Sequence, residues 1–592
     1  MPFKKILIAN RGEVAVRILR AAQDLGIATV AVFSRDDAQA LHAQLADDAL
    51  ALDATGPAAY LDSAALIAIA RAAGADAVHP GYGFLSERAD FAQACADAGL
   101  VFIGPTPAQL ALFGDKASAR ALAAQHGVPL LPGTGAATLE EIQAFFAEQR
   151  ARNPTCGVML KAVAGGGGRG MRAVHDPAAL TEAYARCSAE ALAAFGVGAV
   201  YAERLIEQAR HLEVQVLGDG RQVMALGERE CTLQRRFQKL VEIAPSPGLN
   251  PALRAQLIAA ALQLARASAY CGLGTFEFLV DDNAADLPFV FIEANPRLQV
   301  EHTITEAVTG VDLVAAQIGV AAGQTLAALG LDAAHPPAAH GVAIQWRINA
   351  ETLDASGQAR PSSGRLSRCD FAQGPGVRVD THAYAGLAPS PHHDSLLAKL
   401  VVHHAGSYAQ ALRRSQRALA ECRLDGLATN LPLLRALAAH DDLAHHAIHT
   451  RWLEAAWPQL QGQLAAHTDV APHAAAAATE ATGPAEASIP EGHIALRAPM
   501  AGKLVQFNAK PGQTLAAGAE ALVLEAMKMQ HGISAPGAVQ VLALCVAAGD
   551  FVAEGQLLMT LAAVDQAEAA VADAQAHGLD HIRADLQRVQ AR

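Results

Sequence analysis

The chain has 592 residues, of which 52% are hydrophobic and 17% are charged. This length exceeds what one hydrophobic core serves, and so apolar a composition excludes wholesale disorder, so several folded domains are expected. The formal charge of -13, from 58 acidic and 45 basic residues, is mild for this size. Without a basic stripe, it argues against nucleic-acid binding.

The cysteines and the N-terminus indicate a cytoplasmic protein that is not bound to a membrane. Eight cysteines include no C-x-x-C pair, which argues against disulfide scaffolding and thiolate zinc sites and favours a reducing cytosol. MPFKK runs directly into the apolar ILIA, without the h-region of a secretory signal. The uncharged stretch from Leu313 to Leu331 is interrupted by glycine and glutamine, so we interpret it as a buried helix and a turn.

The first hundred residues alternate strands and helices. KKILIAN and IATVAVF have the composition of buried parallel strands, residues 12–23 form the helix between them, and ADAVHP and VFIGP end two later strands. This alternation predicts a doubly wound α/β domain. The first turn, Asn10-Arg11-Gly12-Glu13, is not G-x-G-x-x-G, so it does not favour dinucleotide binding.

A glycine run between two strands is the first candidate site. In VMLKAVAGGGGRGMRAV, residues 158–174, the backbone amides of such a loop can approach phosphate oxygens closely. The Lys-Ser or Lys-Thr pair of a P-loop is missing, and a flexible surface hairpin is the alternative interpretation. Lys161 on the incoming strand and Lys116 in Gly-Asp-Lys add candidate phosphate ligands.

A second candidate site lies in the stretch GTFEFLVDDNAADLPFVFIEANPRLQVEH. Glu277 and Glu293 fall on two apolar strands of a predicted hairpin, and Asn295 shares a strand face with Glu293. Two carboxylates and an amide form a hard oxygen site suited to Mg²⁺ beside nucleotide phosphates. Salt-bridged strand carboxylates are the alternative, but a buried acid is costly without a cation.

Three further residues, Arg297, Gln299 and Glu301, follow at a spacing of two. The arginine could hold a small anion, and the glutamate could take a proton from it. Ordinary surface charge is the alternative for each residue taken singly.

The C-terminal third contains a linker and a repeat. Residues 466–490 are rich in alanine, proline and threonine without an aromatic residue, as in linkers. Beyond them, Ala498-Pro499 recurs as Ala535-Pro536, 37 residues later. Two similar β-rich halves forming a small barrel or sandwich are predicted. EAMKMQ joins the halves and places Lys528 in the connecting turn.

These motifs resemble two known families. KILIANRGEVAVRILRA, HPGYGFLSERADFA, GDKASAR, KAVAGGGGRGMR, HLEVQVLGDG, ERECTLQRRFQK, FIEANPRLQVEH and WRINAE resemble the biotin carboxylases of the ATP-grasp superfamily, over residues 1–445. EAMKMQ resembles the biotin-attachment site of biotinyl carrier domains. The module order resembles the biotin-carrying subunit of bacterial acyl-CoA carboxylases.

The resemblance implies a role for each matching residue. ATP would be bound by Lys116, Lys161, Glu203, Leu205 and His211, with Gly166 and Gly167 over its phosphates. Mg²⁺ or Mn²⁺ would be held by Glu277, Glu293 and Asn295, and bicarbonate by Lys239, Arg297, Gln299 and Val300. Glu301 would be the general base, Arg347 would stabilise the biotin enolate, and Lys528 would carry biotin.

Three positions depart from the pattern of the biotin carboxylases. Phe237 replaces the histidine of the common RRHQK and is expected to alter nucleotide affinity, because it cannot hydrogen-bond. Trp346 is bulkier than the usual residue and is a candidate to reshape the biotin pocket. Arg204 replaces a lysine and keeps its charge.

The resemblance also implies the fold class and the domain order. The predicted fold is α/β, with a doubly wound N-terminal domain, an ATP-grasp domain with a mobile lid, an α+β C-terminal carboxylase domain and a small all-β biotinyl domain. The expected order is the N-terminal domain (1–114), ATP-grasp domain (115–335, lid about 132–205), C-terminal carboxylase domain (336–447), helical extension (448–465), linker (466–493), biotinyl domain (494–564) and helical tail (565–592).

The activity implied is ATP-dependent carboxylation of biotin with bicarbonate. ATP would activate bicarbonate as carboxyphosphate, and the lid would exclude water, which hydrolyses that intermediate. Only 28 residues follow Val564, so a separate carboxyltransferase (beta) subunit acting on an acyl-CoA is expected, in a hetero-oligomer. Biotin protein ligase is expected to load Lys528.

Two other functions stay open on the sequence. Phe237 could have cost the catalytic centre its activity, leaving a biotin carrier and scaffold. Alternatively, the chain could be another ATP-grasp ligase, joining a carboxylate to an amine with EAMKM unmodified. The modification state of Lys528 separates the latter from a biotin enzyme.

Overall fold

The computed structural model describes ten segments of the chain, which are 3–154, 156–163, 171–195, 197–236, 238–282, 287–390, 392–464, 493–526, 529–552 and 554–564. Gly166, Gly167, Phe237, Lys528, the tail and nearly all of the predicted linker lie outside them. The chain divides into two compact units. The first comprises 1–349, 365–387 and 396–467, and the second comprises 350–364, 388–395 and 468–592.

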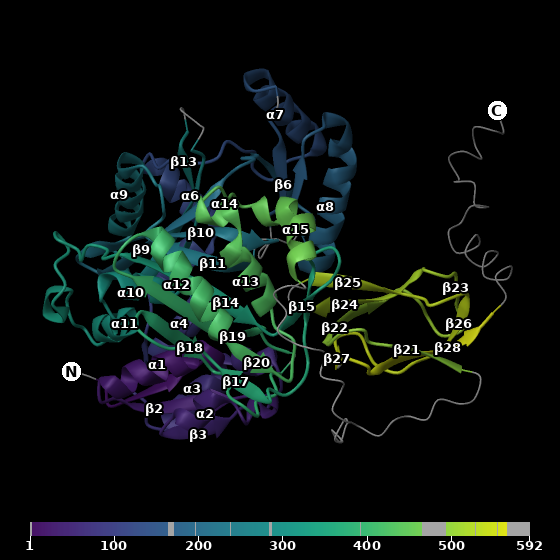
Figure 1. Ribbon diagram of the computed structural model, residues 1–592, viewed down its shortest axis with the longest axis horizontal. Coiled ribbons are helices and arrows are strands. Elements are labelled where there is room, and N and C mark those ends of the chain that lie inside the picture. The colour runs from purple at the N-terminus through teal and green to yellow at the C-terminus, as the bar shows by residue number, and fades with distance from the viewer. Residues whose placement is uncertain are drawn as a thin grey trace. The chain divides into compact units, whose positions relative to one another are not determined.

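A five-stranded parallel sheet forms the N-terminal part of the first unit (Figure 1). Because side chains alternate along a strand, Ile6 and Ile8 enter one core and Leu7 enters another on the opposite face. Both faces are therefore covered, which confirms the predicted doubly wound domain. Its strands, in spatial order, are β3 (Asp48–Ala51), β2 (Ala28–Phe33), β1 (Lys5–Ile8), β4 (Ala77–His79) and β5 (Val101–Phe102), and its helices are α1 (Gly12–Asp24), α2 (Leu41–Leu45), α3 (Ser63–Ala72) and α4 (Ala89–Asp97).

Two helices follow this sheet in the chain. The Thr106 hydroxyl and the Gln109 side chain form a capping box at the start of α5 (Pro107–Gly114). The Asp115 carboxylate accepts from the backbone of Ser118 and caps α6 (Lys116–Gln125). Lys116 is therefore fixed as the first residue of a helix.

The segment that contains the glycine run forms a small sheet with its own core. β6 (Val158–Ala162) pairs antiparallel with β7 (Met171–Val174) on one side and with β8 (Val200–Arg204) on the other. Helices α7 (Leu139–Arg152) and α8 (Leu180–Phe195) belong to the same segment. The two strands predicted to flank the glycine run are thus confirmed, and they pair antiparallel.

An eight-stranded antiparallel sheet forms the centre of the first unit. The sheet crosses the predicted domain boundary at residue 335. Its strand β11 lies before that boundary and pairs with β14, which lies after it, over Val241–Ala244 and Ala343–Trp346. The predicted ATP-grasp and C-terminal parts therefore share one sheet. In spatial order its strands are β13 (Phe289–Asn295), β12 (Cys271–Val280), β9 (Arg210–Asp219), β10 (Val223–Arg235), β11 (Gln238–Ala244), β14 (Val342–Asn349), β19 (Leu396–His404) and β18 (Val377–Thr381).

Helices pack on this sheet at several places. α9 (Pro251–Ala267) packs on β9 and β10, α10 (His302–Thr309) packs on β10 and β14, and α12 (Tyr408–Glu421) packs on β14 and β19 (Figure 1). The remaining elements of the first unit are α11 (Leu313–Ala321), α13 (Leu431–Ala439), α14 (Asp441–Ala444), α15 (Trp452–Leu464), the paired strands β17 (Arg368–Asp370) and β20 (Arg423–Asp425), and the short 3-10 helices at Arg35–Asp37, Pro57–Leu61, Pro177–Ala179 and Ala327–Leu329.

The second unit contains two four-stranded sheets around one apolar core. Its strands confirm the predicted repeat, because the bounds of β22, β23 and β24 recur 37 residues later as those of β26, β27 and β28. One sheet has the order β21 (His493–Arg497), β28 (Leu557–Ala563), β26 (Val539–Leu544) and β23 (Thr514–Leu515). The other has the order β25 (Met529–Ser534), β24 (Glu520–Ala526), β22 (Gly502–Phe507) and β27 (Phe551–Val552). The unit also includes the hairpin of β15 (Glu351–Leu353) and β16 (Ala359–Pro361).

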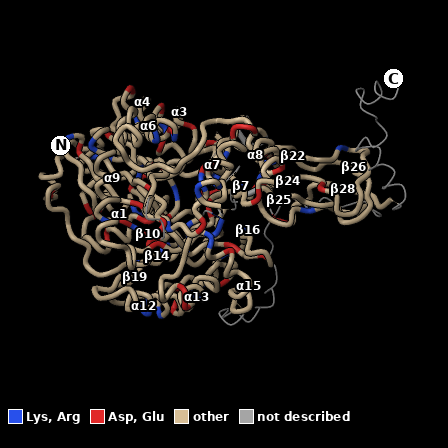
Figure 2. Tube along the Cα trace, turned by 90° about the horizontal axis from the view of Figure 1, so that it is seen from above, with Lys and Arg blue, Asp and Glu red and all other residues tan. Residues whose placement is uncertain are grey.

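Among the described helices, none is by itself long and apolar enough to cross a membrane. Only the pair α10 and α11 meets the length and composition together, and the two are bent by 100°. α11 and the following turn confirm the predicted buried helix. Along the described trace, acidic and basic residues are interspersed (Figure 2).

Candidate active site

The predicted hairpin of carboxylates is formed by β12 and β13. Glu277 and Glu293 are directly opposite each other in the register, and Asn295 donates from Nδ2 to Oε1 of Glu277 at 2.8 Å. The neighbours Phe276 and Phe278 point into the apolar core on the other face. Three hard oxygen-bearing side chains thus share one face, and this donor set suits a divalent metal ion.

Each of these two carboxylates has a cation beside it. Lys239 Nζ lies 3.2 Å from Oε1 of Glu277, and Lys116 Nζ lies 2.9 Å from Oε2 of Glu293. Nε2 of His211 is 2.7 Å from the other oxygen of Glu277. Burial alone would raise the pKa of Glu277, but Lys239 and His211 lower it, so the carboxylate stays ionised. The carboxylates predicted as metal ligands therefore also form the salt bridges of the alternative interpretation.

Lys239 of β11 has three carboxylates around it. Its ammonium lies 2.8 Å from Glu213 and 2.7 Å from Glu301, in addition to Glu277. Burial alone would lower its pKa, but the surrounding negative groups raise the pKa well above the usual value. A partly buried lysine that stays charged can bind an anion that displaces one of these carboxylates.

Glu301 lies between two cations at the start of α10. Its Oε1 accepts a hydrogen bond from Nζ of Lys239, and its Oε2 accepts one from Nη2 of Arg347 at 3.0 Å. The residue caps α10 without a side-chain hydrogen bond to the helix, which leaves the carboxylate to these cations. Burial alone would raise the pKa of Glu301, but Lys239 and Arg347 lower it well below its usual value. The group is therefore in its proton-accepting form.

Arg347 is itself held by a residue that the sequence interpretation missed. Its Nε donates to Oε1 of Glu242 at 2.5 Å, and Gln345 donates to Oε2 of the same carboxylate at 2.9 Å. Glu242 is fully buried in the apolar strand KLVEIA. An acid flanked by apolar strand residues is the same signal that identified Glu277, so it could have been found.

Trp346 points away from this cluster. Neighbouring residues of a strand face opposite sides of the sheet, so the indole lies on the face opposite to Arg347, and it is fully buried. Its bulk fills the core there.

The spacing of Arg297, Gln299 and Glu301 arises from a loop between β13 and α10, not from a strand. Arg297 donates from Nη1 to Gln299 at 3.1 Å and from Nη2 to Asn295 at 3.1 Å. Its Nε is paired with Glu87, a second residue that the sequence interpretation missed although it lies in the quoted HPGYGFLSERADFA. The loop thus places the predicted anion-binding arginine beside the predicted metal ligand Asn295.

The remaining predicted nucleotide residues fall into two groups. In the first group, Glu203 of β8 forms salt bridges with Lys161 of β6 (Nζ to Oε2, 2.6 Å) and with Arg120 of α6 (Nη1 to Oε1, 2.8 Å). His211 belongs to the Glu277 group, and Gln234 contacts its Nδ1 at 2.8 Å. Leu205 is buried, and its backbone N–H donates to Gly157 at 3.0 Å.

A further trio of ligand-type atoms lies in the same cluster. Glu213, Cys231 and Glu301 offer atoms within 4.8 Å of one another. Lys239 already lies against both carboxylates, and Arg229 Nε donates to Glu213 at 2.6 Å. Burial and the nearby carboxylates raise the pKa of Cys231 well above its usual value, so the thiol is not a nucleophile here.

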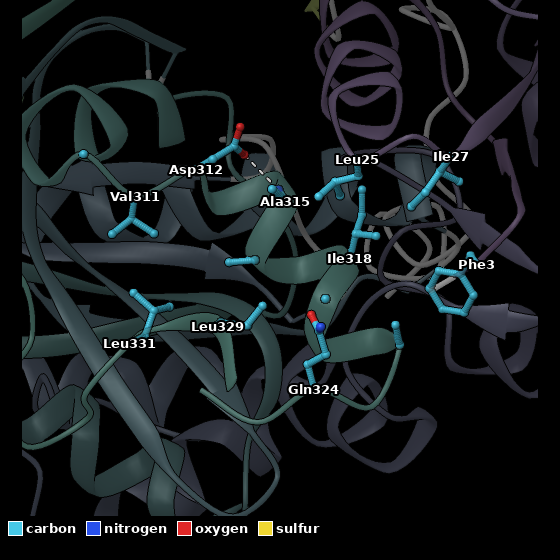
Figure 3. A pocket seen from close by; sticks show the side chains of 14 residues that line it. Phe3, Leu25, Ile27, Val311, Asp312, Ala315, Ile318, Gln324, Leu329 and Leu331 are labelled. Carbon is cyan, nitrogen blue, oxygen red and sulfur yellow. Dashed lines mark hydrogen bonds between the residues drawn. The ribbon is translucent and has the colours of Figure 1, made fainter. Parts of the chain in front are cut away.

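A cavity of about 430 Å³ lies elsewhere in the first unit. Its walls are mostly apolar, and Figure 3 shows Phe3, Leu25 and Ile27 on one side of α11, with Val311 and Leu331 on the other. None of the predicted site residues lines it. The charged cluster, not this cavity, is therefore the candidate active site.

Models of four protein domain families match the chain. They are the biotin carboxylase N-terminal domain over residues 2–110, the ATP-binding domain of the carbamoyl-phosphate synthase L chain over 115–329, the biotin carboxylase C-terminal domain over 345–455 and the biotin-requiring enzyme domain over 494–561.

Two curated relatives illustrate the range of similar proteins. The biotin-dependent acyl-coenzyme A carboxylase alpha3 subunit of Mycobacterium leprae is 38% identical over 94% of this chain and 98% of its own length. The mitochondrial pyruvate carboxylase of Mus musculus is 46% identical over 76% of this chain. The match covers only 38% of the pyruvate carboxylase.

Two solved structures are also similar. A single-chain, multi-domain long-chain acyl-CoA carboxylase has a TM-score of 0.68 and 40% identity, covering 99% of this chain and 52% of that one. The biotin carboxylase domain of the Hydrogenobacter thermophilus 2-oxoglutarate carboxylase, in complex with MgADP, ADP and bicarbonate, has a TM-score of 0.71 and 38% identity, covering 78% of this chain and 99% of that one.

Proposed function

Because the chain belongs to the biotin carboxylase family and also contains a biotinyl domain, we propose that it carboxylates biotin on Lys528, using ATP and bicarbonate. The observation that carries the proposal is the position of Glu301, an ionised carboxylate held between Lys239 and Arg347. Lys239 is assigned to bicarbonate and Arg347 to biotin, so the proton acceptor lies between the two proposed substrate sites.

Bicarbonate is assigned to Lys239, Arg297, Gln299 and the backbone of Val300. Lys239 and Arg297 are partly buried cations whose partners are carboxylates and amides, and an entering anion competes for the same donors. That competition weakens the hold of Lys239 on Glu301 and raises the pKa of the carboxylate from its low resting value. Glu301 thereby becomes a better base when its substrate is present.

The first step proceeds by proton removal and phosphoryl transfer. Glu301 takes the bicarbonate proton, the freed oxygen bonds to the γ-phosphorus of ATP, and the bond from that phosphorus to ADP breaks. Lys116, Lys161 and His211 are assigned to ATP, together with Glu203, Leu205, Gly166 and Gly167. Lys116 and Lys161 are each paired with a carboxylate, so they are oriented cations for phosphate oxygens.

Glu277, Glu293 and Asn295 fit Mg²⁺ or Mn²⁺, because they supply hard oxygens on one strand face. A bound ion would offset charge on the nucleotide phosphates. Lys116 and Lys239 neutralise the two carboxylates in its absence. The bicarbonate and MgADP found with the Hydrogenobacter relative support both assignments.

Arg347 is assigned to biotin. Carboxyphosphate would break down to CO₂ and phosphate, and the phosphate would take the proton of the biotin ureido nitrogen, which then bonds to the carbon of CO₂. Negative charge develops meanwhile on the ureido carbonyl oxygen, and a fixed guanidinium stabilises that charge. The bonds from Arg347 to Glu242 and Glu301 fix the orientation of the guanidinium before biotin arrives. Biotin protein ligase is proposed to attach the biotin to Lys528, which lies in EAMKMQ between β24 and β25.

An acyl-CoA is the proposed final acceptor, through a separate carboxyltransferase subunit in a hetero-oligomer. The acyl-CoA carboxylase subunit of M. leprae matches over nearly its whole length, whereas pyruvate carboxylase matches over 38% of its length. Pyruvate is the competing acceptor. Assays of the biotinylated chain with its co-purified partner, over a panel of CoA thioesters and pyruvate, distinguish the two.

The core of the proposal is tested by ADP release from the purified chain with free biotin. We expect release that depends on bicarbonate, and a loss of about 100-fold or more in Glu301→Gln, the range typical of a lost general base. Glu140→Gln, an exposed acid on α7, is the matched control. ADP release without bicarbonate dependence, or a fully active Glu301→Gln, would refute the assignment.

A further inference from the structure

Lys399 is a fully buried cation next to the proposed active site. It lies on β19, and the register places it directly opposite Arg347 of β14. Directly opposite residues of an antiparallel pair point to the same face, where like charges repel. The pair therefore needs compensation, which Arg347 receives from Glu242 and Glu301.

The partners of Lys399 come from other parts of the first unit. Its Nζ lies 2.9 Å from Oε2 of Glu13, which is 3% exposed, and the other oxygen of Glu13 accepts from the Tyr82 hydroxyl at 2.6 Å. The same ammonium donates to the backbone carbonyl of Val300 at 3.0 Å. Asp380 of β18 is opposite Lys399 on its other side.

The bond to Val300 bears on the geometry of Glu301. The Val300 carbonyl belongs to the peptide group that links Val300 to Glu301. A hydrogen bond to that oxygen therefore fixes the orientation of this peptide plane, and with it the direction in which the Glu301 side chain points. The surrounding loop, residues 296–301, contains no strand or α-helix. Two adjacent cations thus hold consecutive parts of it: Lys399 holds the peptide, and Arg347 holds the carboxylate.

We propose that Lys399 is a positioning residue for biotin carboxylation, which orients Glu301 by anchoring the Val300 carbonyl, with Glu13 and Tyr82 keeping the buried ammonium in place. The inference rests on the proposed role of Glu301 as general base. It also gives the N-terminal turn Asn10-Arg11-Gly12-Glu13 a function, although this turn contributes no predicted ligand.

The competing explanation is a purely structural ion pair between Lys399 and Glu13. Removing one member of a buried pair is strongly destabilising, whereas replacing both by neutral groups is often tolerated. A double variant therefore separates the two explanations. Lys399→Met combined with Glu13→Gln removes both charges, and also removes the only donor that the described structure places on the Val300 carbonyl.

The experiment compares Lys399→Met, Glu13→Gln and the double variant in the full-length chain. Unfolding temperature, kcat for bicarbonate-dependent ADP release and KM for ATP are measured for each, with activity expressed per folded protein. Lys5→Met with Asp48→Asn is the matched control, because it removes an exposed pair of the same 2.9 Å length. Glu301→Gln is run alongside to test the underlying function.

We expect the double variant to recover the unfolding temperature lost in Lys399→Met but not its kcat. The kcat should stay about 10- to 100-fold below wild type, the effect of a misplaced catalytic group, with KM for ATP within about threefold. Glu13→Gln should lower kcat less than Lys399→Met does, because Lys399 keeps its donor to Val300 but loses one of the two groups that hold its ammonium. Recovery of both stability and kcat in the double variant would overturn the proposal.

Lys399→Arg covers the case in which the methionine variants do not fold. It keeps a cation and a donor, so its kcat is expected to lie closer to wild type than to Glu301→Gln. A folded Lys399→Arg as inactive as Glu301→Gln, with no loss of stability, contradicts the anchoring role. If Glu301→Gln itself is active, the proposed function fails first, which is a distinguishable result.

Discussion

Arg347 donates from Nη2 to Oε2 of Glu301 at 3.0 Å, so the residue proposed to stabilise biotin is in direct contact with the proposed general base. The guanidinium is shared with Glu242 on its other side. A change in the charge of Glu301 therefore changes the electrostatic environment of the Arg347 guanidinium. On the proposed mechanism, protonation of Glu301 by bicarbonate would remove one of the two negative charges beside Arg347, and the guanidinium would then interact more strongly with biotin.

Arg347→Lys tests this coupling. A lysine keeps the charge but has no planar fork to bridge two carboxylates, so we expect kcat for carboxylation of free biotin to fall about 10- to 100-fold. KM for ATP should change by less than about threefold, because Arg347 is not assigned to the nucleotide. Initial rates with varied ATP at saturating biotin measure both constants.

The control for Arg347→Lys is Arg417→Lys, which alters an exposed arginine paired with Glu421 on α12. It should leave both constants unchanged. A rise in KM for ATP with an unchanged kcat would contradict the assignment of Arg347 to biotin.

Lys161→Gln tests the nucleotide assignment. Lys161 and Arg120 both lie on the Glu203 carboxylate, and a charge-assisted hydrogen bond contributes about 1.5–3 kcal/mol. We expect KM for ATP to rise about tenfold or more, with a smaller change in KM for bicarbonate. Lys503→Gln, an exposed lysine of β22, is the control. Equal effects on the two KM values would argue against a specific contact with ATP.

Local sequence patterns were sufficient to predict several elements and much of the site. The β12–β13 hairpin was predictable because apolar residues flank Glu277 and Glu293 within one short segment. The repeat in the second unit was predictable because turn residues recur at a fixed interval. In both cases the deciding contacts are between neighbours in the chain or between copies of one pattern.

The cluster around Glu301 could not be assembled in the same way. Lys399 and Val300 are 99 residues apart, and Lys239 and Glu301 are 62 apart, so no spacing within one segment indicates that they meet. The pairing of β11 with β14, which brings Glu242 to Arg347, depends on a sheet register between distant segments. Only the family resemblance gave Lys239 and Arg347 a role, and it did not identify Glu13, Glu87 or Lys399.

Lys528→Arg tests the attachment of biotin. The register pairs Ala526 with Met529, so Lys528 belongs to the connection between the two strands. Lysine is the only residue type in EAMKMQ whose side chain has an amine that can form an amide with biotin. We expect the wild-type chain, expressed with an active biotin ligase, to gain the mass of biotin on the peptide with EAMKMQ. Lys528→Arg should gain none, and it should still release ADP with free biotin.

The controls for biotin attachment are Lys503→Arg and Lys510→Arg in the same domain, which should keep the modification. An unmodified wild-type peptide would favour the alternative of another ATP-grasp ligase.

Two buried histidines should make stability depend on pH. His42 and His382 bind backbone carbonyls through Nε2 at 3.1 and 3.0 Å, and burial lowers the pKa of each to about 4. An unfolded histidine has a pKa of about 6.5. Between these values the unfolded chain binds more protons than the folded one, so stability is complete above pH 6.5 and falls as the pH drops towards 4.

The measurement is the urea midpoint at about pH 7 and about pH 5, for wild type and for His42→Gln with His382→Gln. Each histidine contributes up to about 1.4 kcal/mol per pH unit in that window, and glutamine keeps a donor without a titrating charge. The double variant should therefore lose less stability on acidification. His335→Gln, which alters a histidine with an 85% exposed side chain, should behave like wild type. If the double variant and wild type lose equal stability between the two pH values, other groups account for the acid sensitivity.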